Sequence, residues 1–296
     1  MEPGKTRVLV TGASGTIGRF IATRFLQEGY LVTALGRRDP ALPGLEFSPF
    51  DLDDDGPHIP AADILIHCAL KHVPGKFRGG EGDDPSGFLS ANVDGTRRLF
   101  ERAIDAGCKT IFFLSSRAVY GDHRKGETLQ ETDPPCPSTL YGEVKQAGED
   151  VLESLCGNGV VGIALRATGV YGRPSGSLEH KWSALFTEAF AGQTVAPRKG
   201  TEVHGDDLAG ALLCVLRNRE SLAANFQSYN VSDLMLDRRE LLSELCRVSG
   251  ASVVLPPPSA NTPGEMSTDK LRALGWSPGG KKRLREFLTQ VHRALD

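Results

Sequence analysis

The chain has 296 residues, of which 40% are hydrophobic and 24% are charged, an ordinary globular composition for one large domain or two closely joined ones. A formal net charge of −3 with the two signs interspersed argues against nucleic acid and an anionic membrane surface as partners. The N-terminus lacks the apolar stretch of a signal peptide, and no part of the chain offers the ~20 apolar residues of a membrane span. Six single cysteines lack zinc-site spacing, so we expect a cytoplasmic protein with reduced thiols and no metal.

In chain order, short apolar stretches alternate with helical patterns. Strands are predicted at residues 8–11, 31–35, 63–66, 110–114, 160–165 and 227–231. Helices are predicted at residues 17–25, 88–106, 141–155, 182–190, 206–216 and 238–248. Strands that are apolar throughout, and that alternate with helices, indicate a parallel sheet covered on both faces.

We therefore predict a doubly wound α/β fold of the Rossmann type with a smaller C-terminal α/β portion. Residues 1–166 are expected to form the dinucleotide-binding domain, with residues 203–232 returning to it. Residues 167–202 and 233–296 are expected to form the substrate-binding portion, where proline and glycine are frequent.

A glycine-rich turn follows the first predicted strand and opens the first helix, the context that a phosphate-binding turn requires. Glycines let the backbone turn tightly and approach a pyrophosphate, and the helix N-terminus offers unpaired N–H groups. A tight loop without a ligand is the alternative. The cofactor-binding residues predicted here are Gly12, Ser14, Gly15, Thr16, Ile17 and Gly18.

The end of the second predicted strand bears on the choice between NAD and NADP. An acidic residue about 20 residues past the glycines commonly binds the ribose 2′-hydroxyl of NAD. Here the sequence reads Leu35-Gly36-Arg37-Arg38, and Arg37 could instead bind a 2′-phosphate. We predict NADP in preference to NAD, the alternative being that both arginines face solvent.

Tyr141 and Lys145 stand four residues apart on a predicted helix and so share one face of it. A free tyrosine has a pKa of about 10, too high for a base at neutral pH. A neighbouring lysine ammonium favours the phenolate, which makes tyrosine a proton shuttle between alcohol and ketone. An ordinary surface helix with this common spacing is the alternative.

Together with the glycine turn, these residues resemble the short-chain dehydrogenase/reductase superfamily, and more narrowly its extended NAD-dependent epimerase/dehydratase branch, which acts on nucleotide sugars. The similarity spans nearly the whole chain. Its segments are the serine segment Leu114–Gly121, the asparagine helix Asn92–Thr96, the adenine-contacting turn Asp51-Leu52, the strand His67-Cys68-Ala69, and the later segments Leu165–Gly172, Val203–Ala209, Tyr229–Val231 and Asp269–Pro278.

The resemblance implies a role for each matching residue. Tyr141 would be the acid/base, Lys145 its partner and a cofactor-ribose contact, Ser116 a donor to the substrate oxygen, and Asn92 a support for a water chain linked to the lysine. Asp51, Leu52, Cys68, Ala69 and Thr168 would contact the cofactor, and Tyr120 and Tyr171 the substrate. Apart from the resemblance, His72 could contact the substrate, the alternative being a structural or solvated histidine. We also expect a homodimer.

Some positions depart from the family's pattern. Ala167 stands where proline is usual, and Gly205 where valine is usual. The compact C-terminal portion fits a substrate smaller than a full nucleotide sugar. Arg117-Ala118 replaces the acidic pair of the dehydratases, which argues against 4,6-dehydration.

We predict an NAD(P)-dependent oxidoreductase or epimerase acting on a sugar or nucleotide-sugar hydroxyl or ketone, and the sequence leaves the choice between these two open. The alternatives are a non-catalytic NADP-binding redox sensor and a reductase of a small non-sugar carbonyl compound. Retention of both Tyr141 and Lys145 argues against the sensor.

Overall fold

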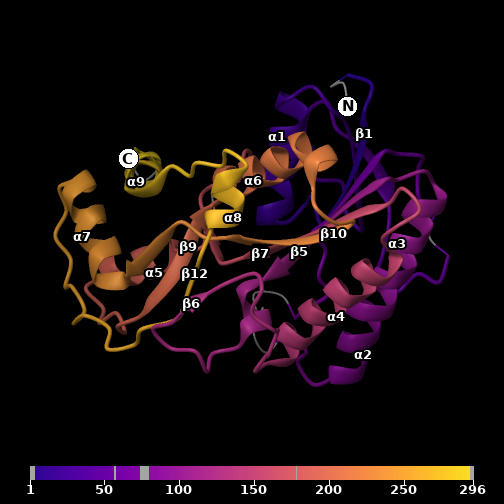
Figure 1. Cartoon of the computed structure of the whole chain (residues 1–296). Helices are drawn as coiled ribbons and strands as arrows, with labels where there is room; N and C mark the ends of the chain where they lie inside the picture. Colours follow the sequence, from indigo (N-terminus) through magenta and orange to yellow (C-terminus); the bar gives the residue numbers. More distant parts are fainter. Residues whose placement is uncertain (1–3, 57, 74–79, 178, 294–296) are drawn as a thin grey trace.

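The computed structural model describes residues 4–56, 58–73, 80–177 and 179–293 (Figure 1). Its central sheet has seven strands in the order β10-β7-β5-β4-β1-β2-β3, and every pairing is parallel. The predicted doubly wound α/β fold is thereby confirmed. The strands are β1 (Arg7–Thr11), β2 (Leu31–Gly36), β3 (Glu46–Pro49), β4 (Ile64–His67), β5 (Thr110–Ser116), β7 (Val161–Ala167) and β10 (Phe226–Val231).

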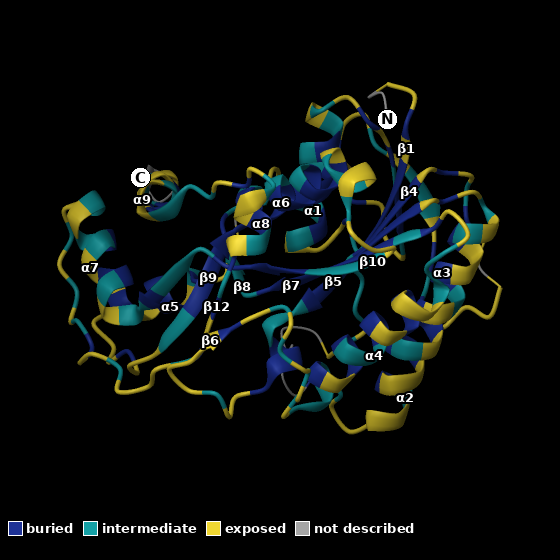
Figure 2. Ribbon diagram, in the orientation of Figure 1, coloured by how far each residue is buried: buried dark blue, intermediate teal, exposed yellow. Residues whose placement is uncertain are grey.

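Helices cover both faces of this sheet because its strands send apolar side chains to both sides. Val8 and Val10 of β1 belong to the core cluster that packs against α1 (Thr16–Gln27) and α6 (Gly205–Arg217). Leu9, between them, belongs to the opposite cluster. That cluster includes side chains of α3 (Gly95–Asp105) and α4 (Leu140–Leu155). Figure 2 shows the result, with buried strands between helices whose outer faces are exposed.

A second, smaller part of the molecule lies beside the central sheet (Figure 1). Its three-stranded sheet has the order β11-β9-β8. The strands are β8 (Gly169–Tyr171), β9 (Lys199–His204) and β11 (Leu234–Asp237), and the helices are α5 (Ser183–Phe190), α7 (Arg238–Ser249) and α9 (Gly280–Arg293). Tyr171, Trp182 and Phe287 lie in its separate core.

The remaining elements are short. They are α2 (Pro85–Leu89), a π-helix (Ser90–Asp94), 3₁₀ turns at Arg117–Tyr120 and Arg219–Ser221, α8 (Asp269–Ala273), and the paired strands β6 (Thr128–Leu129) and β12 (Glu265–Met266). The chain leaves the central sheet after β7 and returns to it at β10, which pairs with β7.

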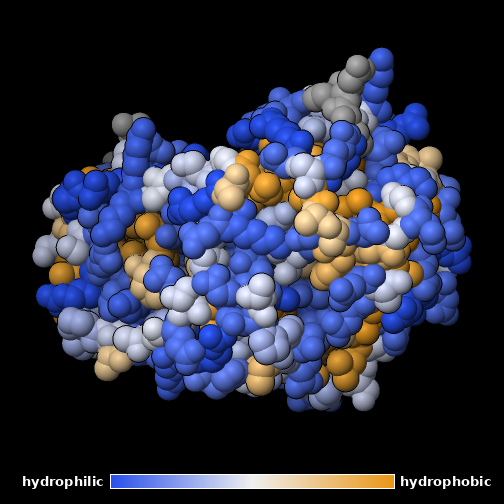
Figure 3. Space-filling model, in the orientation of Figure 1, coloured by the Kyte–Doolittle hydropathy of each residue, from blue (hydrophilic) through white to orange (hydrophobic). Residues whose placement is uncertain are grey.

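Hydrophilic side chains cover most of the face seen in Figure 3, and apolar atoms gather mainly on the half that holds the central sheet. Among the described residues, no helix combines the length and the apolar character needed to cross a bilayer. The described residues also contain no group of three or more histidine, cysteine or acidic side chains that could hold a metal ion.

Candidate functional site

The glycine turn joins β1 to α1 at the carboxyl end of the sheet. Gly12 has a φ of +70°, and a Cβ placed there would lie 2.9 Å from the backbone nitrogen of Ala69, so no larger residue fits. Gly15 is the N-cap residue of α1, and no side chain caps the helix there. The N–H groups of the first helical turn and the helix dipole therefore suit an anionic group, which fits the pyrophosphate of a dinucleotide.

Thr11 ties this turn to the end of β4. Its Oγ1 accepts the backbone N–H groups of Cys68 at 3.0 Å and of Ala69 at 3.1 Å. Two of the residues predicted to contact the cofactor thus lie directly beside the glycine turn. The turn and the segment after β4 form one continuous edge.

The same hydroxyl fixes the tautomer of a buried histidine. Because Thr11 Oγ1 already accepts two N–H groups, its own proton goes to Nδ1 of His67, 2.7 Å away. Nε2–H of His67 then donates to Thr96 Oγ1 at 3.0 Å, and Thr96 donates to the Asn92 carbonyl at 2.7 Å. Burial and, secondly, the Lys145 cation lower the pKa of His67 to about 3, so the ring is neutral.

This chain of hydrogen bonds links β1, β4 and α3 beneath the glycine turn. Our sequence reasoning assigned no role to the His67 ring and considered His72 instead. His72 Nδ1 lies 2.7 Å from the carbonyl of Val73. A polar residue at the end of the otherwise apolar stretch Ile64–Ile66 is the signal that could have identified His67.

The ends of β2 and β3 bring Arg37 beside the predicted adenine-contacting turn. Nε of Arg37 lies 4.0 Å from Oδ2 of Asp51, and the arginine side chain is 69% exposed. The Leu52 carbonyl accepts a hydrogen bond from Nη2 of Arg98 at 2.9 Å, and the Leu52 side chain is buried. Arg37 is thus a surface cation next to the adenosine end of the predicted site, held only loosely by one carboxylate.

Tyr141 and Lys145 lie in the first two turns of α4, as their spacing predicted. Thr139 caps this helix by accepting the N–H of Gly142 at 3.1 Å. Lys145 Nζ lies 5.9 Å from the centroid of the Tyr141 ring and donates to the Leu114 carbonyl of β5 at 2.7 Å. The ammonium therefore lies between the tyrosine and the carboxyl-terminal part of β5.

Lys145 is 3% exposed, an unusual position for a cation. Burial lowers its pKa from 10.5 to about 8, while the Glu149 carboxylate opposes part of that change. The ring of Phe113 lies 4.9 Å from Nζ. Lys145 is therefore a largely dehydrated cation that titrates close to neutral pH.

Ser116 ends β5 and caps the 3₁₀ turn Arg117–Tyr120, with its Oγ accepting the N–H of Ala118 at 3.1 Å. The start of α4 reaches the same turn, because a Cβ at Gly142 would lie only 2.6 Å from the Ala118 carbonyl oxygen. The structure thus brings the serine segment against the helical turn that begins with Tyr141. Ser116 is half-buried, so its hydroxyl is not enclosed.

Asn92 has different contacts from those the resemblance implies. Its side-chain amide donates to the carbonyls of Lys71 and Phe88, both at 2.8 Å, and its Oδ1 accepts the N–H of Lys71 at 2.7 Å. Both polar atoms of the amide are therefore occupied in fixing the segment that follows β4. These contacts show that Asn92 positions the segment after β4, and its predicted support of a water chain stays a prediction.

Three other predicted contacts point into the protein. The Tyr120 hydroxyl lies between Asn230 and Arg166 at 2.7 and 2.9 Å, and the buried Tyr171 ring stacks on Trp182 at 5.0 Å. The Thr168 hydroxyl donates to the Thr201 carbonyl at 2.6 Å. Tyr120 and Tyr171 are enclosed by protein, so neither ring is free to contact a substrate as the resemblance implied.

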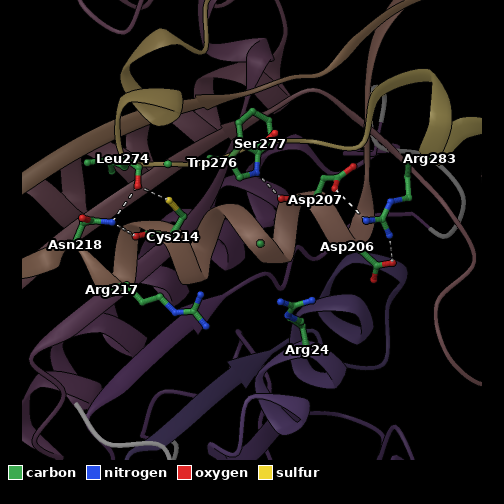
Figure 4. Close-up of a pocket in the computed structure, with 12 residues that line it drawn as sticks. Arg24, Asp206, Asp207, Cys214, Arg217, Asn218, Leu274, Trp276, Ser277 and Arg283 are labelled. Carbon is green, nitrogen blue, oxygen red and sulfur yellow. Dashed lines mark hydrogen bonds and ion pairs between the residues drawn. The ribbon is translucent and has the colours of Figure 1, made fainter.

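A pocket of about 380 Å³ lies elsewhere, where α6 meets α1, α8 and the segment before α9 (Figure 4). Arg283 pairs there with Asp206 at 3.2 Å, and Asp207 accepts the N–H of Gly279 at 3.1 Å. Among the residues described, its lining contains no predicted catalytic or cofactor residue. We therefore take the candidate active site to be the edge formed by the glycine turn, the end of β4 and the start of α4.

Comparisons with known proteins show the family to which the chain is related. The model of the NAD dependent epimerase/dehydratase family matches residues 8–232. The dTDP-6-deoxy-L-talose 4-dehydrogenase (NAD(P)(+)) of Kitasatospora kifunensis is 28% identical, with 97% of this chain and 95% of the relative covered. The UDP-glucose 4-epimerase of Lacticaseibacillus casei is 27% identical over 92% of this chain and 91% of its own.

A solved structure extends the similarity to the fold. The UDP-glucose 4-epimerase of Thermus thermophilus in complex with NAD has a TM-score of 0.76 and 25% identity, with 98% of this chain and 100% of that chain covered. NAD is the cofactor named by both the family and this complex, so the comparisons do not support the predicted preference for NADP. The expected NAD(P)-dependent enzyme of the extended short-chain type is confirmed. Since the family model spans most of the sequence, this chain belongs to the NAD dependent epimerase/dehydratase family.

Proposed function

We propose that this chain oxidises and reduces a ring carbon of a nucleoside-diphosphate sugar, with Tyr141 as the acid/base. The observation that carries the proposal is the buried Lys145 ammonium, anchored on the Leu114 carbonyl and 5.9 Å from the Tyr141 ring. A dehydrated cation favours the phenolate over the phenol. Tyr141 can therefore take the proton of a sugar hydroxyl as the carbon becomes a ketone, and return it in the reverse direction.

Four residues of this chain would support that step together with the cofactor. The nicotinamide, when bound, supplies the acceptor and donor of hydride. The Ser116 hydroxyl would donate to the substrate oxygen, and the N–H bonds of Lys145 not used by Leu114 would contact the cofactor ribose. Cys68 and Ala69, held by Thr11, would line the cofactor beside the reacting carbon.

The relatives favour C4 of the sugar as the reacting position. Both names given above describe reactions at C4, one on a dTDP-sugar and one on a UDP-sugar. A return of hydride to the opposite face of the ring gives an epimerase, and loss of the reduced cofactor gives a dehydrogenase. We further propose that the second sheet and the helices α5, α7 and α9 hold the nucleotide part of the substrate, and that the enzyme is a cytoplasmic homodimer.

For the cofactor, we propose that Arg37 lets the chain bind NADP at least as well as NAD. The guanidinium is exposed at the end of β2, and no acid stands on the strand tip to repel a 2′-phosphate. Asp51, 4.0 Å from Arg37, would orient the guanidinium without neutralising it fully.

The test begins with titration of the purified protein with NADH and NADPH, followed by incubation with UDP-sugars and dTDP-sugars. Absorbance of the reduced cofactor detects a dehydrogenase, and product separation detects an epimerase, which leaves no net absorbance change. Tyr141→Phe should bind the cofactor as the unaltered protein does and lose at least about 100-fold in kcat, the usual contribution of acid/base catalysis. Turnover of Tyr141→Phe at the unaltered rate would disprove the assignment.

A further inference from the structure

A buried carboxylate–guanidinium pair joins α4 to β7, the neighbour of the edge strand β10. Glu149 of α4 and Arg166 of β7 are only 3% and 5% exposed. Arg166 Nη2 donates to Glu149 Oε2 at 2.7 Å, and Nε lies 3.1 and 3.2 Å from the two carboxylate oxygens. A forked guanidinium contact of this kind restricts the relative orientation of its two partners more strongly than a single charge does.

The pair reaches three other elements through hydrogen bonds. The Ser115 hydroxyl, one residue before Ser116, donates to Glu149 Oε1. Arg166 Nη1 donates to the Tyr120 hydroxyl at 2.9 Å, and Tyr120 donates to Asn230 of β10 at 2.7 Å. The end of β5, the 3₁₀ turn after it and the edge strand are therefore connected to one carboxylate on α4.

Glu149 shares a helix face with the proposed catalytic residues. It lies one turn beyond Lys145 and two turns beyond Tyr141, at intervals of four residues. On the same side, a Cβ at Gly148 would lie 2.4 Å from the Phe113 ring, so the helix approaches the sheet closely. The forked ion pair adds a directional polar contact to this close approach, beside the hydrogen bond from Lys145 to the Leu114 carbonyl.

We propose that Glu149 and Arg166 are positioning residues that fix α4 against β5. They thereby hold Tyr141 and Lys145 level with Ser116 along the axis of α4. This inference rests on the proposed function, since it is the proposed acid/base that is positioned. A buried ion pair contributes little net stability compared with apolar side chains of the same volume. Orientation of the helix is therefore the better explanation of its presence.

The pair also sets the charge around Lys145. The titratable groups facing this ammonium are Glu149 and Tyr141 of α4 and His67 and Cys68 at the end of β4. The Glu149 carboxylate raises the pKa of Lys145 and so offsets part of the effect of burial. Loss of this carboxylate alone would leave the Arg166 cation unbalanced and lower the pKa of Lys145 further.

Four variants test the proposal. Glu149→Gln removes the charge at nearly constant size, and Arg166→Lys keeps the charge but loses the fork. Glu149→Gln with Arg166→Met removes both charges. Glu153→Gln, an exposed glutamate one turn further along α4, is the matched control.

We expect Glu149→Gln and Arg166→Lys each to lower kcat by roughly tenfold or more, since a small displacement of a catalytic group costs 10- to 100-fold. KM should stay within about twofold, and Glu153→Gln should match the unaltered enzyme. The alkaline limb of the pH–kcat profile should move to lower pH in Glu149→Gln and return toward its original position in the double variant. A lowered Tm with unchanged kcat per cofactor-binding site would overturn the proposal, because it would show a structural role alone.

Amide hydrogen exchange separates this inference from the proposed function, since it needs no substrate. With cofactor bound, Glu149→Gln should raise exchange in both α4 and the Phe113–Ser116 segment, and Glu153→Gln should not. If no nucleotide sugar is turned over but this coupled change is seen, the proposed function fails and the positioning role stands. If exchange in β5 is unchanged in Glu149→Gln, the positioning role is wrong.

Discussion

Replacing Lys145 by methionine should abolish activity with little loss of stability at neutral pH. In the folded protein the pKa of this lysine falls from 10.5 to about 8 because the ammonium is buried. One pKa unit corresponds to about 1.36 kcal/mol, so burial of the charged lysine lowers the free energy of unfolding by about 3 kcal/mol. Lys145→Met removes that cost but leaves the Leu114 carbonyl without its donor, a loss of about 1–3 kcal/mol.

The sign of the pH dependence follows from the two pKa values. Below about pH 8 lysine 145 is protonated in both states, and its burial cost is fully present. Between about pH 8 and pH 10.5 the folded protein releases the proton first, so the free energy of unfolding of the unaltered protein rises with pH. Methionine does not titrate. The unaltered protein should therefore gain about 2 kcal/mol relative to Lys145→Met between pH 8 and pH 10.

Urea unfolding at a series of pH values measures this difference directly. The matched control is Lys109→Met, which removes an exposed lysine just before β5. Groups that do not interact with the mutated lysine titrate alike in each pair and cancel. A constant difference between Lys145→Met and the unaltered protein over this pH range would refute the reasoning, because it would mean that the lysine is not a buried cation at neutral pH.

Two further substitutions test the cofactor edge. Arg37→Ala should weaken NADPH binding by roughly tenfold, which is the scale of one charge-assisted hydrogen bond, and should change NADH binding little. A fluorescence titration measures both affinities. Equal losses of affinity for NADPH and NADH would contradict a contact between Arg37 and the 2′-phosphate. Thr11→Val leaves the N–H groups of Cys68 and Ala69 without their acceptor and should lower the free energy of unfolding by about 2–4 kcal/mol. Thr11→Ser, which keeps the hydroxyl, is its control, and equal urea midpoints for the two variants would count against the role of Thr11.

The sequence predicted most of the central sheet because its inner strands are apolar throughout. The stretches predicted at 110–114 and 160–165 appear as β5 and β7. Several strands were missed, and two of them, β3 and β9, were missed for a common reason. Glu46–Pro49 is a half-exposed edge strand, and Lys199–His204 carries mostly polar residues, so neither has the apolar run on which the prediction relied.

The site was predicted in part. Helical spacing placed Tyr141 and Lys145 on one face because that relation is local. The contacts of Arg166 with Glu149, and of Thr11 with His67, join residues distant in sequence, and the spacing of residues carries no signal for such pairs. Motif resemblance also gave Tyr120 a place in the serine segment without showing that its ring faces the interior.

The most direct test of proton transfer by Tyr141 is a single-turnover experiment. Saturating UDP-glucose is mixed with enzyme that carries a stoichiometric amount of oxidised cofactor, and absorbance of the reduced nicotinamide is followed; dTDP-sugars are used in the same way. The unaltered protein should form reduced cofactor with at least one of these sugars, and Tyr141→Phe should form it at least about 100 times more slowly with unchanged cofactor affinity. Equal rates in the two proteins would contradict the assignment of Tyr141 as the acid/base.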